Sequence, residues 1–576
     1  MNKWTPVIVA VLMAVAASIG AQELVVEGTV KRANGRPAPS VLVAAIPHAG
    51  DWWSVAAVTR TARDGTFRFS GLPAGQYALT ATSARDSAGF IEKVTGPADI
   101  TMGRRGRKLT GTARHENGEP LRGRVTAARL SSQRGDLFVM ETDAEGRFAA
   151  MLPPGRYRVF TEAADGKVEQ PVDLQSGDEF VPLQLERVFH VTPPAVVEWV
   201  RREAVVLATP EPGHGFEDMQ PLRRIVGNSR IVALGESTHG TREFFQLKHR
   251  MLEFLVREMG FTAFAIEASM PDTKAVHDYV LYGEGEPEEA VAAMGVGAWN
   301  TEEMVNMVRW MRAYNEDPRN TTRIRFYGFD MQNPKASVRI LREYLDRVDP
   351  DFARRMALTS IDDLERALTE NRQRYAAASS QTEWAWARRQ IDLVRQGEEL
   401  MRVTARASAV RDRWMAANVK WILDHEPAGS KIVLWAHNGH VAAEPPRFLD
   451  GSSMGEHLRS IYGDAVRIFG FAFNGGRFRA LDTASGELRE YRVQAAKPAS
   501  VDGALAAAGI PLFAIDLRTA TGVARRWLES PVEQRVIGTG YDPAFPGNYW
   551  APLHPLRSYD ALIFVDETTA TQLSTP

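Results

Sequence analysis

Short apolar runs separated by long amphipathic stretches dominate this chain from Val191 to its end. The stretches between the early runs carry helical repeats, such as the stripe that begins at Phe244 and closes at Gly260. Continuous apolar runs of this length are typical of strands covered on both faces. The alternation predicts an α/β domain over 191–576 with a mostly parallel central sheet. The expected strands are 231–235, 263–266, 324–329, 431–436, 465–471, 512–515 and 561–565.

Four of these runs end in titratable side chains. The first ends in Gly235-Glu236-Ser237-Thr238-His239-Gly240, and the next two end in Glu267 and Asp330. The fourth ends in His437-Asn438-Gly439-His440. Because the carboxyl ends of parallel strands meet at one edge of a sheet, these groups are predicted to line one site.

Glutamate and histidine at such an edge suit general-base chemistry. A neutral imidazole beside a carboxylate can take a proton from water, and a second imidazole or a lysine can stabilise an oxyanion. Lys248 follows His239 on the same predicted helix, and it is expected either at the pocket rim or on the solvated surface. The catalytic candidates are His239, Glu236, Glu267 and His437, and the substrate-binding candidates are His440, Lys248 and Asp330.

Two other chemistries are weighed against this one. Glu236, His239, His437 and His440 are possible ligands of a divalent metal, but their spacing is not the H-E-x-x-H pattern, so no metal or other cofactor is expected. Gly451-Ser452-Ser453-Met454-Gly455 matches G-x-S-x-G, yet no strand precedes it, so its serine is interpreted as a helix N-cap.

The segment 334–427 is charged and helical in pattern and shows no strand. Such an insertion is typical of a helical subdomain or lid, or of a plain stabilising helical hairpin. We expect it to form the roof of the site.

The amino-terminal third contains an internal repeat. A Gly-Thr strand start, a Gly in a turn before a phenylalanine, and Leu-Pro-x-Gly-x-Tyr recur in the same order, at Gly28, Gly65 and Leu72 and again at Gly111, Gly146 and Leu152. Short strands between turn signals predict two small all-β sandwiches, over 22–106 and 107–190. The Trp52-Trp53 pair is expected in the core, with a carbohydrate platform as the alternative.

The first residues read as an export signal. A short basic start, an apolar stretch from Val7 to Ala17 and small residues after it are typical of a secretory signal peptide over 1–21, cleaved near Gly20 or Ala21. The chain has no cysteine, which excludes disulfides and thiolate chemistry and fits the bacterial periplasm. The net charge of −2 gives no general attraction to nucleic acid. A secreted or periplasmic protein without a membrane span after cleavage is predicted.

Two family resemblances follow from these motifs. The repeat, with its Asp-Gly-x-Phe and Leu-Pro-x-Gly-x-Tyr landmarks, resembles carboxypeptidase regulatory-like, transthyretin-like domains, which implies a binding or spacer role and possible contact with envelope polysaccharide. The G-E-x-x-H-G and A-H-N-x-H motifs resemble the erythromycin esterase family, over most of 195–570. That resemblance implies a hydrolase that opens a macrolide lactone with activated water, His239 being the general base and Glu236, Glu267, His437 and His440 the other pocket residues. Lys248 stands where some members have arginine.

The sequence therefore predicts two small all-β sandwiches followed by an α/β domain with a helical insertion, acting as an exported hydrolase of an ester or macrolide lactone. The alternative is a secreted metal- or haem-binding protein that uses the same Glu/His cluster. A degenerate enzyme carried by an adhesive β module is disfavoured, because the full Glu/His set is retained.

Overall fold

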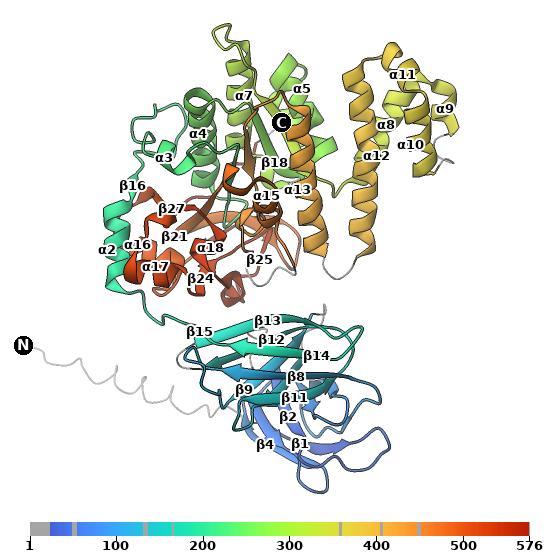
Figure 1. Cartoon of the computed structure of the whole chain (residues 1–576), viewed down its shortest axis with the longest axis vertical. Coiled ribbons are helices and arrows are strands. Elements are labelled where there is room, and N and C mark those ends of the chain that lie inside the picture. Colours follow the sequence, from blue (N-terminus) through green and yellow to red (C-terminus); the bar gives the residue numbers. More distant parts are fainter. Residues whose placement is uncertain are drawn as a thin grey trace, which may run out of the picture. The chain divides into compact units, whose positions relative to one another are not determined.

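The computed structural model describes residues 24–48, 55–130, 136–163, 166–295, 297–355, 360–403, 407–445 and 451–574. The predicted signal peptide and the Trp52-Trp53 pair lie outside the described residues. The chain divides into two compact units, Met1–Val188 and Phe189–Pro576 (Figure 1).

The first unit begins with a small β-sandwich. A three-stranded sheet in the order β4-β1-β7 faces a four-stranded sheet in the order β3-β2-β5-β6, and Val26, Phe67, Val43 and Leu79 pack between them. Its strands are β1 (Leu24–Lys31), β2 (Leu42–Pro47), β3 (Ala57–Arg60), β4 (Thr66–Leu72), β5 (Tyr77–Thr82), β6 (Gly89–Val94) and β7 (Ile100–Thr101).

A second sandwich repeats this plan. Its sheets have the orders β11-β8-β14 and β10-β9-β12-β13-β15, and the parallel pair β8–β14 corresponds to the parallel pair β1–β7. Its strands are β8 (Arg107–Arg114), β9 (Arg124–Arg129), β10 (Leu137–Glu141), β11 (Arg147–Leu152), β12 (Arg156–Ala163), β13 (Gly166–Asp173), β14 (Glu179–Gln184) and β15 (Glu186–Arg187).

The repeated Leu-Pro-x-Gly-x-Tyr motif makes the same corner in both sandwiches. The Tyr77 hydroxyl donates to the Pro73 carbonyl at 2.7 Å, and the Tyr157 hydroxyl donates to the Pro153 carbonyl at 2.6 Å. The two sandwiches also pack on each other, because Leu42 and Ala44 of β2 contact Val139 of β10. Strand β2 is therefore buried on both faces, which explains its continuous apolar sequence.

The second unit is built on a ten-stranded sheet. Its main order is β16-β23-β27-β21-β17-β20-β18-β19. The six strands from β27 to β19 are parallel, whereas β16 and β23 are antiparallel to their neighbours. All seven expected strands are present, and the short strands β16, β22 and β25 were not expected. The bounds are β16 (Val205–Val206), β17 (Ile231–Leu234), β18 (Ala263–Ser269), β19 (Arg325–Asp330), β20 (Ile432–Trp435), β21 (Val466–Asp482), β22 (Leu488–Val493), β23 (Leu512–Asp516), β25 (Gly540–Tyr541) and β27 (Ala561–Thr568), with β24 (Val532–Arg535) and β26 (Trp550–Leu553) pairing separately.

Helices cover both faces of the parallel part of this sheet, so a strand such as β17 has no polar face. Val232 and Leu234 of β17 join one hydrophobic cluster, and Ile231 and Ala233 join the cluster on the opposite face. The helices around the sheet are α2 (Pro194–Glu203), α3 (Leu222–Val226), α4 (Arg242–Met259), α5 (Lys274–Tyr282), α6 (Pro287–Ala292), α7 (Glu302–Glu316), α13 (Ala407–His425), α14 (Asn438–Val441), α15 (Met454–Tyr462), α16 (Val501–Ala506), α17 (Gly522–Leu528) and α18 (Pro555–Ser558).

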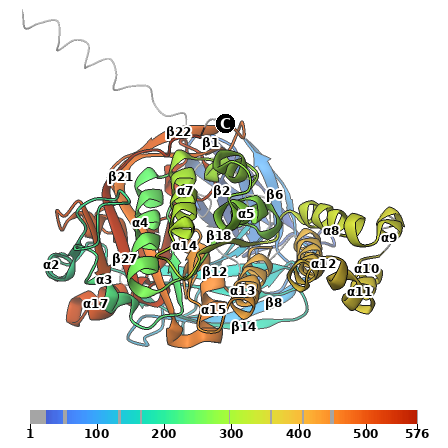
Figure 2. The ribbon, with the colours of Figure 1, turned by 90° about the horizontal axis from the view of Figure 1, so that it is seen from above.

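The predicted insertion 334–427 is helical, but it divides into two parts with different roles. Helices α8–α12 have a small core of their own, which includes Leu341, Leu368 and Tyr375, and they lie to one side of the sheet (Figures 1 and 2). Helix α13 packs on the sheet instead, through residues such as Met415 and Val419. The five helices of the first part are α8 (Pro334–Val348), α9 (Pro350–Arg355), α10 (Ile361–Glu370), α11 (Arg372–Ala378) and α12 (Gln381–Arg402).

Across the described residues, we find no helix that combines the length and the apolar character needed to span a membrane.

Candidate active site

The four strands with titratable ends are neighbours in the sheet, in the order β17-β20-β18-β19. Because all four are parallel, their carboxyl ends meet at one edge, as the sequence predicted. Glu236 follows β17, Glu267 and Asp330 lie in β18 and β19, and His437 and His440 follow β20. The sheet thus brings all the predicted strand-end residues into one region.

Glu236 is the buried anchor of the first half of the site. Its Oε1 lies 2.7 Å from Nδ1 of His239, and its Oε2 accepts hydrogen bonds from Lys248 Nζ at 2.6 Å and from Trp435 Nε1 at 2.9 Å. A carboxylate can only accept, so His239 carries its proton on Nδ1 and leaves Nε2 as a free base. Glu236 therefore sets the tautomer of His239.

Burial and charge compete at Glu236 and at its partner. Burial raises the pKa of Glu236, but the charge of Lys248 and the hydrogen bonds from His239 and Lys248 outweigh it, and the net pKa lies below the ordinary value. Burial also lowers the pKa of the Lys248 ammonium to about 8, against the opposing charge of Glu236. The Nζ atom stands 4.2 Å from the centre of the Trp435 ring, which adds a cation–π contact.

Lys248 is fully buried and is not at a pocket rim. It lies on α4, where its Nζ contacts Glu236 Oε2. Its charge therefore acts on Glu236, and the expectation that it sits on the surface or the rim is wrong for this reason.

His437 presents a hydrogen-bond donor beside His239. Its Nδ1 accepts the Gly439 amide at 3.2 Å, so the proton is on Nε2, and Nε2 is buried without a partner among the described residues. Burial lowers the pKa of His437 to about 3, so the ring is neutral at neutral pH. The two imidazole centres are 5.3 Å apart. A free N–H thus lies next to a free base.

Glu267 holds the backbone of His437 and does not contact His239. Its Oε2 accepts the His437 amide at 2.8 Å, and its Oε1 accepts Arg411 Nη2 at 2.7 Å. Burial raises the pKa of Glu267, but His440 and Arg411 outweigh this effect and hold it well below the ordinary range. Of the two carboxylates that the sequence proposed to orient His239, the structure therefore supports Glu236.

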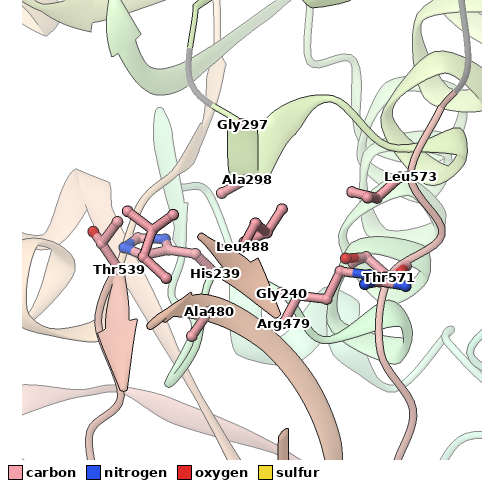
Figure 3. Close-up of a pocket in the computed structure, with 11 residues that line it drawn as sticks. His239, Gly240, Gly297, Ala298, Arg479, Ala480, Leu488, Thr539, Thr571 and Leu573 are labelled. Atoms are coloured by element: carbon pink, nitrogen blue, oxygen red, sulfur yellow. Dashed lines mark hydrogen bonds between the residues drawn. The ribbon is translucent and has the colours of Figure 1, made fainter. Parts of the chain in front are cut away.

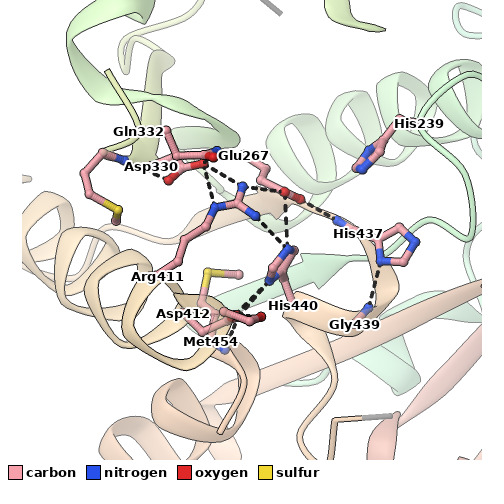
Figure 4. A network of polar contacts seen from close by, with 12 residues as sticks. His239, Glu267, Asp330, Gln332, Arg411, Asp412, His437, Gly439, His440 and Met454 are labelled. Atoms are coloured by element: carbon pink, nitrogen blue, oxygen red, sulfur yellow. Dashed lines mark hydrogen bonds and ion pairs between the residues drawn. The ribbon is translucent and has the colours of Figure 1, made fainter. Parts of the chain in front are cut away.

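Arg411 of α13 connects two of the predicted carboxylates (Figure 4). It donates from Nη2 to Asp330 Oδ2 at 2.6 Å as well as to Glu267. Asp330 is itself 1% exposed and fully engaged by Arg411, Gln332 and the Met331 amide, which leaves no oxygen directed at solvent. Asp330 is thus placed to hold Arg411, and its predicted role in binding substrate has no support from these contacts.

His440 lies between carboxylates. Its Nδ1 is 2.8 Å from Asp412 Oδ1, and its Nε2 is 3.4 Å from Glu267 Oε1 and 3.0 Å from Arg411 Nη1. Burial disfavours a charge on the ring, but Asp412 and Glu267 outweigh it and raise the pKa of His440. His440 and His437 therefore have opposite electrostatic settings although they are three residues apart.

Two glycines of the first motif are required by close approaches. A Cβ at Gly235 would lie 2.2 Å from Asn438 Oδ1, and one at Gly240 would lie 2.2 Å from the Arg479 carbonyl. Asn438 in turn bonds the backbone of Phe471 in both directions, at 2.8 and 3.0 Å. The glycines thus let the β17 loop pack against β21 and the histidine motif.

Sequence reasoning missed Arg411, Asp412 and Trp435. The first two lie in a charged helical segment rich in arginine and aspartate, and nothing in the sequence separates them from the surface pairs of α8–α12. Trp435 was recognised only as part of an apolar strand. Trp299 packs edge-on against the His239 ring with 5.4 Å between centroids.

A pocket opens beside His239 (Figure 3). Its wall includes Ala298, Leu488 and Leu573 together with Arg479 and Thr539, and no residue of α8–α12 lines it. The prediction that the helical insertion roofs the site is therefore wrong for this pocket. The part of the insertion that reaches the site is α13, through Arg411 and Asp412.

Glu236, His239, His437 and His440 are the candidate ligands of a divalent metal. Among the described residues, no group of three or more such side chains is arranged to hold a metal ion. Glu236 is engaged by three hydrogen-bond donors and His440 by Asp412 and Arg411, whereas Nε2 of His239 and Nε2 of His437 have no partner among the described residues. The set Glu236, His239, His437 and His440 therefore offers two free nitrogens, fewer than the three protein ligands of a typical catalytic zinc site.

The G-x-S-x-G segment is a helix start. The Ser453 hydroxyl accepts the Glu456 amide at 3.1 Å and caps α15, as the sequence predicted. Ser237, in the first motif, is fully buried.

Comparison with known proteins identifies the family of the second unit. The family model for erythromycin esterase matches residues 256–568, which include Glu267, Arg411, His437 and His440. The chain belongs to the erythromycin esterase family. The model for the carboxypeptidase regulatory-like domain matches residues 25–102. The resemblance to the erythromycin esterase family is thus confirmed, and the resemblance to the carboxypeptidase regulatory-like domain is confirmed for the first sandwich.

Relatives of this erythromycin esterase family member cover its second unit. An erythromycin esterase type II of Escherichia coli is 24% identical over 366 residues, which are 54% of this chain and 86% of the relative. A crystal structure of a Bacillus cereus protein is 25% identical, covers 66% of this chain and 99% of its own, and has a TM-score of 0.59. A mutant erythromycin esterase in its open conformation, 16% identical with a TM-score of 0.50, covers 65% and 99% and shares the fold.

Proposed function

We propose that this family member hydrolyses a carboxylic ester or lactone by general-base activation of water at His239. The observation that carries the proposal is the Glu236–His239 pair, because a fully buried carboxylate fixes the imidazole tautomer whose Nε2 is a base. The family supports a hydrolase.

The reaction then proceeds in two steps. His239 Nε2 takes a proton from water, and the water oxygen attacks the ester carbonyl carbon. The resulting oxyanion accepts a hydrogen bond from Nε2 of His437, because the neutral ring carries its proton on that nitrogen. Collapse of the intermediate breaks the carbon–oxygen ester bond, and the imidazolium of His239 returns the proton to the leaving alkoxide. The products are a carboxylic acid and an alcohol.

The remaining polar residues hold His239 and His437 in position through hydrogen bonds. Lys248 and Trp435 hold Glu236, Glu267 holds the His437 amide, and Asp412 holds His440. Because these groups contact one another and not the pocket, we assign them to positioning.

A substrate screen tests the proposal. Purified full-length protein is incubated with macrolides and with simple alkyl esters, and the acid released is measured by chromatography. We expect hydrolysis of at least one ester or lactone, and we expect the His239→Ala variant to hydrolyse it at least about a hundredfold more slowly. Absence of turnover with every substrate, or equal turnover by the variant, contradicts the proposal.

Lys248 predicts the alkaline side of the pH profile. Its ammonium has a pKa near 8, so raising the pH above this value removes the cation that holds the buried Glu236 carboxylate. We expect kcat to fall as the pH rises through about 8, and we expect the fall to move to higher pH in Lys248→Arg, since guanidinium stays protonated. The kcat values of both proteins between neutral and alkaline pH check this. An identical alkaline limb in the variant assigns it to another group.

A cofactor-independent reaction is a further part of the proposal. Because Glu236 and His440 are engaged by protein groups, we expect dialysis against EDTA to leave kcat/KM unchanged. Activity and bound metal, measured on the same sample before and after dialysis, check this. Loss of activity that returns with a divalent metal favours the alternative of a metal-binding protein.

The location and the role of the sandwiches are also proposals. We propose export to the periplasm or medium, which the basic start and apolar stretch before Gln22 support. Fractionation with amino-terminal sequencing tests the export, and an unprocessed cytoplasmic chain contradicts it.

The two sandwiches are proposed to contact envelope polysaccharide. Pull-down of the full chain on purified cell-wall polysaccharide tests that role, and absence of retention contradicts it.

A further inference from the structure

Arg479 is a cation in the pocket that the proposed hydrolysis does not use. It lies on β21, and its side chain and that of His239 line the same pocket. His239 and Thr539 lie toward one end, Arg479 and Thr571 lie toward the other, and Leu488 stands between them (Figure 3). The lining between the base and the cation is therefore largely apolar.

The protein fixes the orientation of this guanidinium without neutralising it. The Arg479 amide donates to the Gly240 carbonyl at 2.9 Å, and its Nε donates to the Thr571 carbonyl at 2.7 Å. Within the described chain, Arg479 takes part in no ion pair. The bond at Nε leaves Nη1 and Nη2 as a pair of unused donors on a half-buried side chain.

A carboxylate is the group that best pairs with the two unused N–H donors of Arg479. The two terminal nitrogens of a guanidinium present parallel N–H donors that fit the two oxygens of a carboxylate. An apolar wall strengthens such a charged pair, because it reduces competition from water. A neutral alkyl chain, in contrast, would leave the Arg479 donors without a partner.

We infer that the substrate is an ester whose acyl chain ends in a carboxylate, a half-ester of a dicarboxylic acid. Its ester carbonyl is attacked next to His239, its alkyl chain contacts Leu488, and its carboxylate binds Nη1 and Nη2 of Arg479. This inference rests on the proposed function. Hydrolysis adds water across the ester bond, so the products are a dicarboxylic acid and an alcohol.

Matched ester pairs test the inference. The full-length protein is assayed with monoethyl succinate, adipate and suberate and with their uncharged counterparts ethyl butyrate, hexanoate and octanoate. For at least one chain length, we expect kcat/KM to favour the charged ester. In Arg479→Met, we expect the ratio of charged to neutral kcat/KM to fall roughly ten- to a hundredfold, the usual effect of one charge-assisted contact.

Two further variants separate substrate binding from a change in the fold. Arg479→Lys keeps the charge but loses the fork, so its ratio should lie between those of the wild type and Arg479→Met. Arg477→Met removes a charge from the same hairpin, where Arg477 is exposed and pairs with Glu490 at 2.9 Å, and its ratio should equal that of the wild type. If Arg479→Met lowers kcat/KM equally for both esters, Arg479 is structural and the inference is overturned.

Binding to His239→Ala distinguishes this inference from the proposed function. Calorimetric titration of that variant with the half-esters, with and without Arg479→Met, measures recognition without turnover. Binding that depends on Arg479 in a wild-type protein that cleaves no ester supports the inference and contradicts the proposed function. Hydrolysis with a charged-to-neutral ratio that is the same in the wild type and in Arg479→Met supports the proposed function and contradicts the inference. If the protein neither binds nor hydrolyses these esters, the inference and the proposed function are both overturned.

Discussion

The His239→Ala variant is expected to lose roughly a hundred- to ten-thousandfold in kcat while its fold is retained, since this is the usual contribution of a positioned general base. The loss follows from the geometry: Glu236 holds Nδ1 of His239 at 2.7 Å, and no other imidazole in the described part of the chain bonds to that carboxylate. The fold is retained because Lys248 and Trp435 continue to hold Glu236. The measurement is kcat on an ester cleaved by the wild type, with the circular dichroism spectrum and the unfolding midpoint as controls.

Ser237→Ala is the matched control for this prediction. Ser237 is fully buried two residues before His239, and its hydroxyl has no hydrogen-bond partner among the described residues. Its removal should leave kcat close to that of the wild type. A wild-type rate in His239→Ala, or a collapse of the rate in Ser237→Ala, is incompatible with His239 as the base and favours a serine mechanism.

Arg411→Met is expected to destabilise the second unit by about 3–5 kcal/mol, the usual cost of removing one partner of a buried ion pair. Arg411 is the shared cation of Glu267 and Asp330, at 2.7 and 2.6 Å, and these carboxylates are 8% and 1% exposed. Methionine fills much of the same volume but leaves Asp330 without its cation and leaves Glu267 with His440 alone. Thermal unfolding of the full chain should show a midpoint several degrees lower.

The dependence of this effect on pH follows from the lowered pKa of Glu267. In the wild type, that lowered pKa stabilises the fold above the unfolded pKa of about 4.3, and the contribution is lost as the pH falls further. The difference in midpoint between wild type and Arg411→Met should therefore be largest near neutral pH and should shrink in acid.

Arg413→Met is the control for Arg411→Met. Arg413 lies two residues further along α13, is half exposed, and pairs with Glu399 at 2.7 Å. Exposed pairs contribute little, so its midpoint should match that of the wild type. A midpoint for Arg411→Met that equals that of Arg413→Met shows that the network does not stabilise the fold.

Much of the candidate site could be predicted because the carboxyl ends of parallel strands lie at the same edge of the sheet in any strand order. Glu236, Glu267, Asp330 and His437 each follow or close an apolar run, and parallel strands carry such residues to one edge whatever the exact order. Their partners could not be predicted in the same way. Arg411 and Asp412 reach the site because α13 packs on the sheet, and a charged helix in the sequence gives no indication of which of its faces is buried.

The sequence by itself determined the two sandwiches, the parallel sheet, the family and the residues at the strand ends, because these depend on local periodicity and on motifs whose spacing is fixed. Only the tertiary structure decided what each residue contacts. It placed Lys248 in the core behind Glu236, gave His437 and His440 opposite pKa shifts, and brought α13 into the site while α8–α12 stay beside the sheet. The reason is physical: hydrogen bonds and pKa values depend on burial and on partners far away in the chain, and these exist only once the sheet and its helices have packed.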